Sequence, residues 1–270
     1  MQNELIMLGT GHAMVTKCYN TCFIIRHGNE PFLIDAGGGN GILGQVEHAG
    51  IPWQDIHKMF LTHTHTDHIF GAVWVIRKIA SLLQEGRYHG IFDLYCHEDA
   101  ANALKEICRM TLPEKFTKYI GKDIEIHKVK DGEHARINGM ELTFFDIFSK
   151  KAPQFGFQAI FSDGTKFTCL GDEPYNEHCS HYVFGSDWLL CEAFCLHEER
   201  ERFHPYERFH STAQDAGRLA QKLQVKNLLL YHTEDTALAQ RKERYTKEAA
   251  EEFGGNIFVP DDLEVIPLGK

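Results

Sequence analysis

Residues 60–68 read FLTHTHTDH, and this stretch decides both the fold and the chemistry expected of the chain. His63, His65, Asp67 and His68 follow directly after an apolar run that is typical of a short strand. Imidazole and carboxylate are preferred ligands of zinc and similar divalent ions. Side chains two residues apart in an extended segment face the same way, so His63 and His65 would share one side. Because Asp67 and His68 follow where a helix is expected to begin, the stretch predicts a metal site with two adjacent positions.

Composition places the chain among ordinary globular proteins. Of its 270 residues, 43% are hydrophobic and 24% are charged, which excludes a disordered chain. No apolar run approaches the ~18 residues of a membrane span, and no secretory signal is visible. The eight cysteines are therefore expected to be thiols. The net charge of −10 argues against a broad electrostatic grip on nucleic acid.

Strands and helices are expected on both sides of the central stretch. The N-terminal part predicts a strand over 4–8, a hairpin from 21–26 and 32–35, a helix capped by Asn40 and a buried helix over 69–83. Further strands are expected over 92–96, 124–129, 141–148, 155–161, 166–170, 188–192 and 227–231, and further helices over 98–110, from the capping box at Ser211–Gln214 to 223, and over 238–253. Asp163-Gly164 predicts a hairpin turn. No linker or shift in composition divides the chain, so a single domain over 1–270 is expected.

The pattern His-x-His-x-Asp-His after a strand resembles the signature of the metallo-β-lactamase superfamily. Four other segments resemble that superfamily at matching places along nearly the whole chain, namely Gly9–Gly11, Leu33–Gly37, Gly171-Asp172 and Tyr231-His232. The resemblance implies an α/β fold, a four-layer αβ/βα sandwich with metals at one edge between the sheets. Within the superfamily, residues 186–193 (SDWLLCEA) and 210–213 (HSTA) resemble the ribonuclease Z branch.

This resemblance implies a role for each matching residue. One metal would be held by His63 and His65, the other by Asp67, His68 and His232, with Asp172 bridging the two. The implied cofactor is Zn²⁺, one or two ions, with Mn²⁺ or Fe²⁺ as alternatives. A metal-bound hydroxide would be the nucleophile, because metal binding lowers the pKa of water from about 15.7 toward about 7.

The resemblance also assigns the proton transfers. Asp67 would orient the hydroxide. Glu192 and His210 act together near the leaving group in the ribonuclease Z branch, so His210, polarised by Glu192, would protonate the departing oxygen as general acid. A lone Glu or His at such positions would otherwise be read as a solvated residue or a neighbour of a helix cap.

The sequence departs from the family pattern at the first metal position. One further histidine is expected a few residues before a Gly-aromatic step, and this chain has none there. Phe148 aligns best with the missing ligand, with Ser149 as the second choice. Asp146 would compensate only if it points inward. We therefore expect the first metal to be bound more weakly than the second.

The substrate is expected to be small. Many ribonuclease Z enzymes carry a long arm that holds transfer RNA, and the short stretch between Gly156 and Asp172 has no room for one. A small phosphodiester or a related ester is the expected substrate, with RNA as an alternative. The chain is expected to act in the cytoplasm, away from membranes, as a homodimer.

Two competing readings stay open at this point. In the first, the chain is a hydrolase of another ester, such as a thioester, sulfate ester or lactone. In the second, it is a degenerate metal-binding protein without activity.

Three basic residues follow His232, namely Arg241, Lys242 and Arg244. They would steer an anion, although a solvated helix face is the default for such residues.

Overall fold

Two seven-stranded sheets face each other in the computed structural model, which describes residues 3–269. The first sheet has the order β14-β1-β2-β3-β4-β5-β6 and the second the order β13-β12-β11-β10-β9-β8-β7. The strands of the first sheet are β1 (Asn3–Gly9), β2 (Cys22–His27), β3 (Glu30–Ile34), β4 (Lys58–Leu61), β5 (Phe92–Cys96), β6 (Ile124–Lys128) and β14 (Val265–Pro267). Those of the second are β7 (His134–Ile137), β8 (Met140–Asp146), β9 (Phe155–Ile160), β10 (Lys166–Cys169), β11 (Trp188–Glu192), β12 (Asn227–Tyr231) and β13 (Asn256–Phe258).

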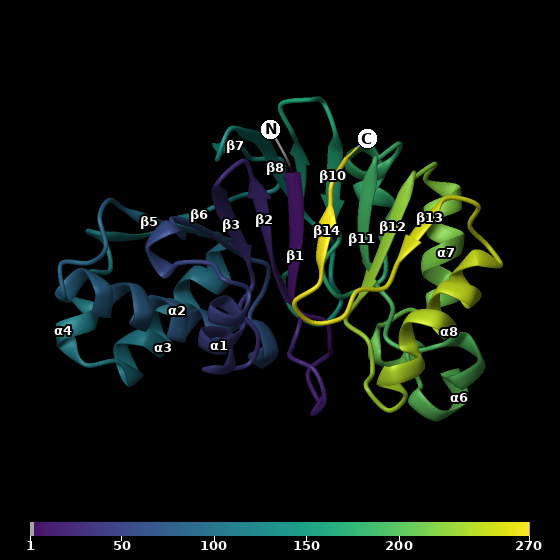
Figure 1. Ribbon diagram of the computed structural model, residues 1–270, viewed down its shortest axis with the longest axis horizontal. Coiled ribbons are helices and arrows are strands. Elements are labelled where there is room, and N and C mark those ends of the chain that lie inside the picture. The colour runs from purple at the N-terminus through teal and green to yellow at the C-terminus, as the bar shows by residue number, and fades with distance from the viewer. Residues whose placement is uncertain (1–2, 270) are drawn as a thin grey trace.

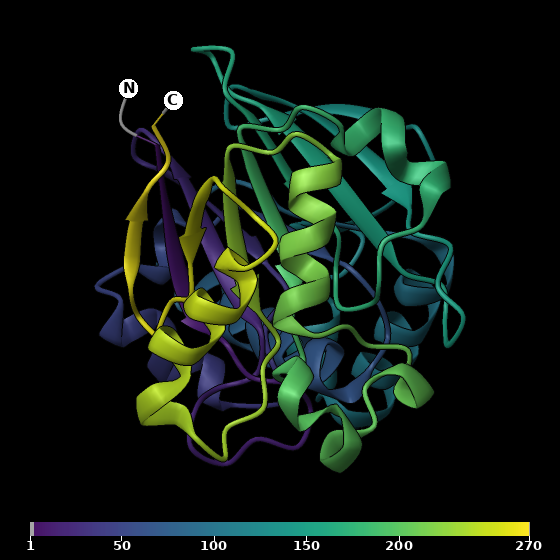
Figure 2. The same cartoon turned by 90° about the vertical axis from the view of Figure 1, so that its right-hand side faces the viewer.

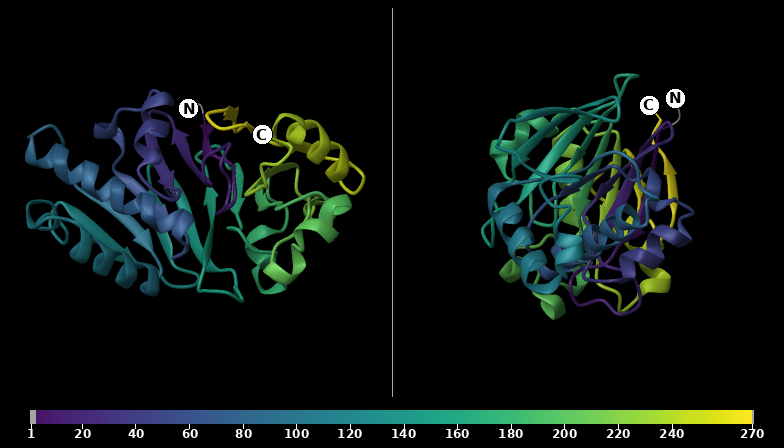
Figure 3. Two further views of the ribbon diagram at one scale, coloured as in Figure 1. Left: turned by 90° about the horizontal axis from the view of Figure 1, so that it is seen from below. Right: turned by 90° about the vertical axis from the view of Figure 1, so that its left-hand side faces the viewer.

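Helices cover the outer face of each sheet, as Figures 1 and 2 show. Those beside the first sheet are α1 (Gly41–His48), α2 (Thr66–Gln84), α3 (Glu98–Thr111) and α4 (Glu114–Thr117). Those beside the second are α5 (Ser180–Val183), α6 (Arg200–Phe203), α7 (Ala213–Lys222) and α8 (Leu238–Ala250). Seen from below in Figure 3, the strands lie between the two helical layers. This arrangement confirms the expected four-layer α/β sandwich.

Apolar side chains fill the three spaces between the four layers. Phe32 and Phe60 of the first sheet and Phe144 and Phe157 of the second are fully buried in one cluster between the sheets. Phe60 contacts Phe144 and Phe157 with ring centroids 4.9 and 5.6 Å apart. Two further clusters lie under the helices. Because both faces of each sheet are buried, the strands read as nearly continuous apolar runs.

The strand connections bring several chain segments to one edge. Strands β3 to β6 run parallel, and so do β10 to β13. Parallel strands end at the same edge of a sheet, where α/β folds place their functional residues. No helix within residues 3–269 combines the length and the apolar character needed to cross a membrane.

Three local expectations are corrected by the structure. Strand β8 ends at Asp146, so Phe148 lies in the following loop, where its φ is +57°. The capping box of α7 is formed by Thr212 and Asp215, because the hydroxyl of Ser211 is used by Glu192 instead. Asn40 precedes α1 but makes no side-chain capping bond.

Candidate metal centre

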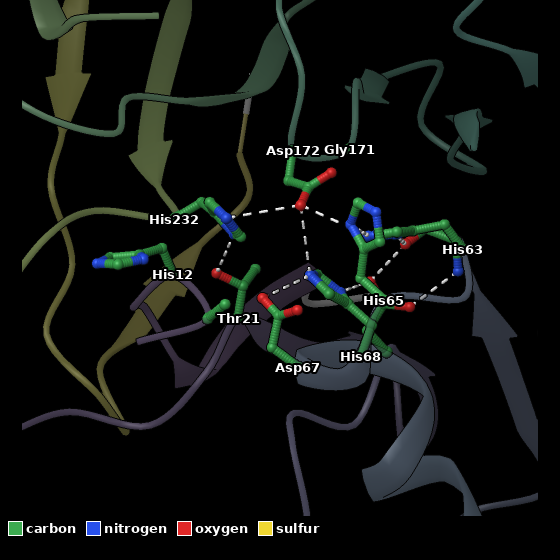
Figure 4. Close-up of polar contacts among 12 residues, drawn as sticks. His12, Thr21, His63, His65, Asp67, His68, Gly171, Asp172 and His232 are labelled. Atoms are coloured by element: carbon green, nitrogen blue, oxygen red, sulfur yellow. Dashed lines mark hydrogen bonds and ion pairs between the residues drawn. The ribbon is translucent and has the colours of Figure 1, made fainter. Parts of the chain in front are cut away.

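Carboxylates and imidazoles meet at the edge where the strands end. Asp35 follows β3, His63 follows β4, Asp172 follows β10 and His232 follows β12. Asp67 and His68 lie in the first turn of α2. Figure 4 shows Asp172 between His232 on one side and the histidines of the 63–68 segment on the other. The structure thus brings together all six residues that the sequence proposed as metal ligands, although they come from three separate parts of the chain.

Asp172 is the centre of this cluster. Its Oδ2 atom lies 3.5 Å from His63 Nε2, 3.6 Å from His68 Nε2 and 3.5 Å from His232 Nε2. Asp67 Oδ2 lies 3.5 Å from the same nitrogen of His68. All of these side chains are buried, and their ligand atoms face one another.

Hydrogen bonds on the far side of two rings fix how they present their nitrogens. Asp35 Oδ2 lies 2.7 Å from His68 Nδ1, and Asp35 is itself held by the N–H and hydroxyl groups of Thr62. Thr21 Oγ1 lies 3.3 Å from His232 Nδ1 and donates to the carbonyl of Gly11. With their Nδ1–H groups engaged in this way, both rings direct a free Nε2 toward Asp172. A second layer of carboxylate and hydroxyl partners is typical of histidines that ligate metals.

The residues present fit a divalent cation. His68 Nε2 is buried and has no hydrogen-bond partner among the described residues, although buried polar atoms are usually paired. Burial lowers the pKa of His63 well below its usual value and that of His232 to about 3, which leaves both rings neutral. Metal binding requires such deprotonated rings.

The acidic members of the cluster are held in their charged form. Burial opposes ionisation of Asp67 and Asp172, but the neighbouring histidines outweigh it and lower the pKa of both carboxyl groups. Burial also opposes the charge of His68, yet Asp35 and Asp67 raise the pKa of its ring. The raised pKa means that His68 binds a second proton readily. A cation placed among these groups would replace that proton.

Three groups of ligand atoms are close enough to hold an ion, and one of them consists of Asp35, His63 and His68. The other two correspond to the two expected metal positions. Asp67, His68, Asp172 and His232 offer four atoms within 4.8 Å of one another, and His63, His65 and Asp172 offer three. In the smaller group, His63 Nε2 and His65 Nδ1 are 2.9 Å apart. The two positions would share Asp172 and differ in the number of donors. The assignment of each residue to a metal stays a prediction.

The residue at the place of the missing ligand is not the one that the sequence predicted. Phe148 is 43% exposed and packs on the ring of His178, so it does not face the cluster. Asp146 does not compensate, because its Oδ1 accepts a bond from the N–H of Phe148. The buried residue at this place is Gln154, whose amide donates to Asp172 Oδ1 and lies 3.2 Å from His63 Nδ1. Gly171 leaves room for this amide, since a Cβ there would lie 2.7 Å from Gln154 Nε2.

Glu192 and His210 form a pair next to the cluster. His210 Nδ1 lies 3.6 Å from Glu192 Oε2, and the His210 ring stacks on that of His232 with centroids 5.4 Å apart. Glu192 is fully buried and accepts bonds from the N–H and hydroxyl groups of Ser211 at 2.5 and 2.7 Å. Burial opposes the charged form of His210, but Glu192 outweighs it and raises the pKa of the ring.

Several residues at the site were not identified from sequence. His12 lies beside His232 with ring centroids 6.3 Å apart, and Lys151 Nζ lies 3.1 Å from His210 Nε2. Arg241, in contrast, was named from the sequence as a residue of a helix that would steer an anion or face solvent. In the structure it is buried in α8 and donates to Thr10 and Thr233, so it ties the loop after β1 to the loop after β12 and is not part of a solvated helix face. Single polar residues in loops carry no local pattern, so only the folded chain reveals these contacts.

Curated relatives and solved structures cover nearly the whole chain. A ribonuclease Z of Thermococcus sibiricus is 25% identical over 307 residues, which cover 99% of this chain and 97% of that relative. A ribonuclease Z of Nocardia farcinica is 26% identical, with 99% and 98% covered. Among solved structures, the metallo-β-lactamase fold protein YhfI of Bacillus subtilis matches with a TM-score of 0.80 at 14% identity, covering 99% of this chain and 100% of that one. The short form of human tRNase Z matches with a TM-score of 0.75 at 20% identity over 99% and 100%.

These likenesses establish the fold and the relationship. The chain has the metallo-β-lactamase fold, and its curated relatives confirm the resemblance to ribonuclease Z. A family model described as "Anti-Pycsar protein Apyc1" matches residues 3–253. The chain therefore belongs to the Anti-Pycsar protein Apyc1 family, as a ribonuclease Z-like member of the metallo-β-lactamase superfamily.

Proposed function

We propose that the chain is a metal-dependent hydrolase, and specifically a phosphodiesterase that acts on a small phosphodiester. The observation that carries this proposal is the Glu192–His210 pair, which lies beside the metal-ligand cluster with the His210 ring stacked on that of His232. A water-activating centre and a proton donor at adjacent places are the two parts that hydrolysis of an ester with a poor leaving group requires.

His63, His65, Asp67, His68, Asp172 and His232 would hold the cation or cations, with Zn²⁺ as the first candidate. When bound, such an ion supplies Lewis acidity and lowers the pKa of water. Asp172 would set the spacing between the two halves of the site, because its Oδ2 faces histidines from both. Asp35 and Thr21 would hold the rings of His68 and His232 in place. Asp67 would accept a proton or orient the attacking water.

His210 would complete the reaction by giving a proton to the departing oxygen. Its ring is fixed by stacking on Phe194, with centroids 4.9 Å apart, and its Nδ1 faces Glu192. The negative charge of Glu192 stabilises the imidazolium form and so keeps a proton available. A good general acid of this kind contributes typically 10²–10⁴-fold to the rate.

A small substrate is supported by the loop architecture. Strands β9 and β10 pair in antiparallel register from Phe157↔Cys169 to Ile160↔Lys166, and the short turn at Asp163-Gly164 joins them directly. No arm protrudes at this place to hold a large nucleic acid. The curated relatives are named ribonuclease Z, so RNA is kept as the second candidate substrate. The homodimer and the cytoplasmic location stay predictions.

Metal analysis combined with a substrate panel tests this function. The purified protein should contain a transition metal and hydrolyse bis(4-nitrophenyl) phosphate, and chelation should abolish this activity. A thioester, a sulfate ester and a lactone are assayed beside it, because the same fold and ligand set could serve them. Preference for one of those esters would replace the phosphodiesterase proposal. Metal binding without any hydrolysis would favour the degenerate metal-binding protein.

A further inference from the structure

A lysine that the metal-ligand pattern does not include reaches into the site. Lys151 lies in the loop between β8 and β9, and its Nζ is 3.1 Å from His210 Nε2. Its side chain is only 22% exposed, which is low for a lysine in a loop. The ammonium group therefore lies on the side of His210 opposite to Glu192, which faces the other ring nitrogen.

The loop is anchored so that Lys151 is held in this place. Glu173, the residue after Asp172, is buried and accepts a bond from Ser149 Oγ at 2.6 Å and one from the Lys150 N–H at 3.1 Å. Ser149 Oγ in turn accepts from the N–H groups of Lys151 and Ala152 at 3.2 and 3.3 Å. The position of Lys151 is thus coupled to the segment that carries the central carboxylate of the site.

This contact determines which atoms can donate in the free protein. An ammonium group has donors and no acceptor, so His210 Nε2 must accept the bond from Lys151. The ring proton then lies on Nδ1, which faces Glu192 Oε2. Glu173 Oε1 is 4.0 Å from Lys151 Nζ, so this carboxylate is close but not in hydrogen-bond contact. The ammonium has further donors to offer. It must leave Nε2 before that nitrogen can take up a proton from solvent, which the charge of Glu192 favours, and then give this proton to a leaving group.

A phosphodiester provides an acceptor that the Lys151 ammonium can bind when it leaves His210 Nε2. Its non-bridging oxygens carry one negative charge at neutral pH and would lie beside His210 when the leaving group does. We propose that Lys151 contacts the substrate and binds a non-bridging phosphoryl oxygen in exchange for His210 Nε2, so that the site selects anionic diesters over uncharged esters. This inference rests on the proposed phosphodiesterase function and adds a specificity-determining residue to it.

A purely structural lysine would behave differently from a substrate-binding one. If Lys151 only positioned the His210 ring, its loss would affect all substrates that use His210 and would not depend on substrate charge. If it binds the anion, its loss should affect the charged substrate alone. Two substrates that share a leaving group and differ in charge separate these roles.

The test compares bis(4-nitrophenyl) phosphate, an anion, with diethyl 4-nitrophenyl phosphate, an uncharged triester. Both release 4-nitrophenolate, which needs no proton, so the contribution of His210 is removed from the comparison. Lys151→Gln should lower kcat/KM for the diester by about 10- to 100-fold, mainly through KM, since a hydrogen bond to a charged group contributes this much. The triester should be unaffected, and Lys151→Arg should recover most of the loss.

Lys150→Gln is the matched control. The side chain of Lys150 lies over the ring of Phe209, 6.0 Å from its centroid, and only its backbone N–H contacts Glu173. This neighbour has the same charge and should leave both substrates unchanged. The metal content of all three variants should equal that of the wild type, because Lys151 belongs to none of the groups of metal ligands.

Calorimetric titration with inorganic phosphate gives a readout that does not depend on turnover. Lys151→Gln should weaken phosphate binding about tenfold or more, and Lys150→Gln should not. Equal losses for diester and triester, or an unchanged phosphate affinity, would overturn the role of Lys151 while leaving the phosphodiesterase proposal intact. A wild-type protein that hydrolyses no phosphodiester would instead refute the proposed function, and the phosphate affinities would then still decide whether Lys151 binds an anion.

Discussion

At the scale of single residues, His210 has the contacts of a proton donor. His210→Ala should leave the metal content intact and slow substrates with poor leaving groups by about 10²–10⁴-fold. A substrate that releases nitrophenolate should lose much less, because that anion needs no proton. Glu192→Gln should show the same pattern more weakly, since it removes the charge that faces His210 but keeps the ring. Steady-state rates over a series of leaving groups measure this.

Two controls make the result specific. His134→Ala changes an exposed histidine of β7 and should alter neither rate nor metal content. His68→Ala should reduce hydrolysis of both substrate types, because it removes a ligand atom from the cluster. If His210→Ala slows all substrates equally or strips the metal, His210 is a structural residue or a ligand.

Asp35 is expected to control metal affinity although it is not one of the six proposed ligands. Its Oδ2 accepts from His68 Nδ1 at 2.7 Å, and its φ of +54° is one that asparagine also adopts. Asp35→Asn keeps the shape and removes the charge, so it should weaken metal binding about 10- to 100-fold. Competition with a chelator of known affinity measures this. Asp99→Asn, on the exposed start of α3, serves as the control, and an equal affinity in both variants would show that Asp35 does not tune His68.

At the scale of elements, α2 must approach the loop after β3 very closely. The N–H of Gly71 donates to the carbonyl of Gly37 at 2.8 Å, and a Cβ on Gly71 would lie only 1.8 Å from the carbonyl oxygen of Ala36. Gly71→Ala should therefore destabilise the protein by more than about 1 kcal/mol and displace the helix start that carries Asp67 and His68. Urea unfolding and a metal titration measure the two effects.

Gly44 in α1 provides the opposite expectation for the same substitution. The nearest atom to a Cβ there is His48 Cε1 at 3.9 Å, so the added methyl group meets no obstacle. Gly44→Ala should stabilise the protein by up to about 1 kcal/mol, because alanine has the higher helix propensity. Equal effects of the two substitutions would contradict the close packing of α2 against the loop.

At the scale of the whole molecule, a bound metal would join the two sheets. His63, His65, Asp67 and His68 follow β4 of the first sheet, whereas Asp172 and His232 follow β10 and β12 of the second. An ion that binds only the folded state adds about 2.7 kcal/mol of stability at a free concentration 100 times its Kd. The free energy of unfolding should therefore fall by about this amount after chelation, as measured by urea denaturation. Asp172→Asn should reduce the difference, and an unchanged stability would show that no such cross-link exists.

The sequence alone predicted the four layers, through the family resemblance, and the proposed set of metal ligands. Strands β5, β11 and β12 have the predicted bounds, because buried strands leave continuous apolar runs between turn residues. His63, His65, Asp67 and His68 were recognisable because they lie within one short stretch after a strand. Asp172, Glu192, His210 and His232 were found through resemblance, since each is an isolated residue.

Only the tertiary structure decided which polar residues surround that set. Asp35, Gln154, Lys151 and Arg241 are far from their partners in sequence. Asp35 follows a strand of the parallel part of its sheet, Gln154 and Lys151 lie in the loop between the antiparallel strands β8 and β9, and Arg241 belongs to α8. The alignment with Phe148 failed because β8 ends two residues earlier and the loop turns that side chain outward. A sequence pattern records the local period of a strand or helix, whereas contacts across loops depend on backbone turns, such as the positive φ at Asp35, Phe148 and His232, that no local period specifies.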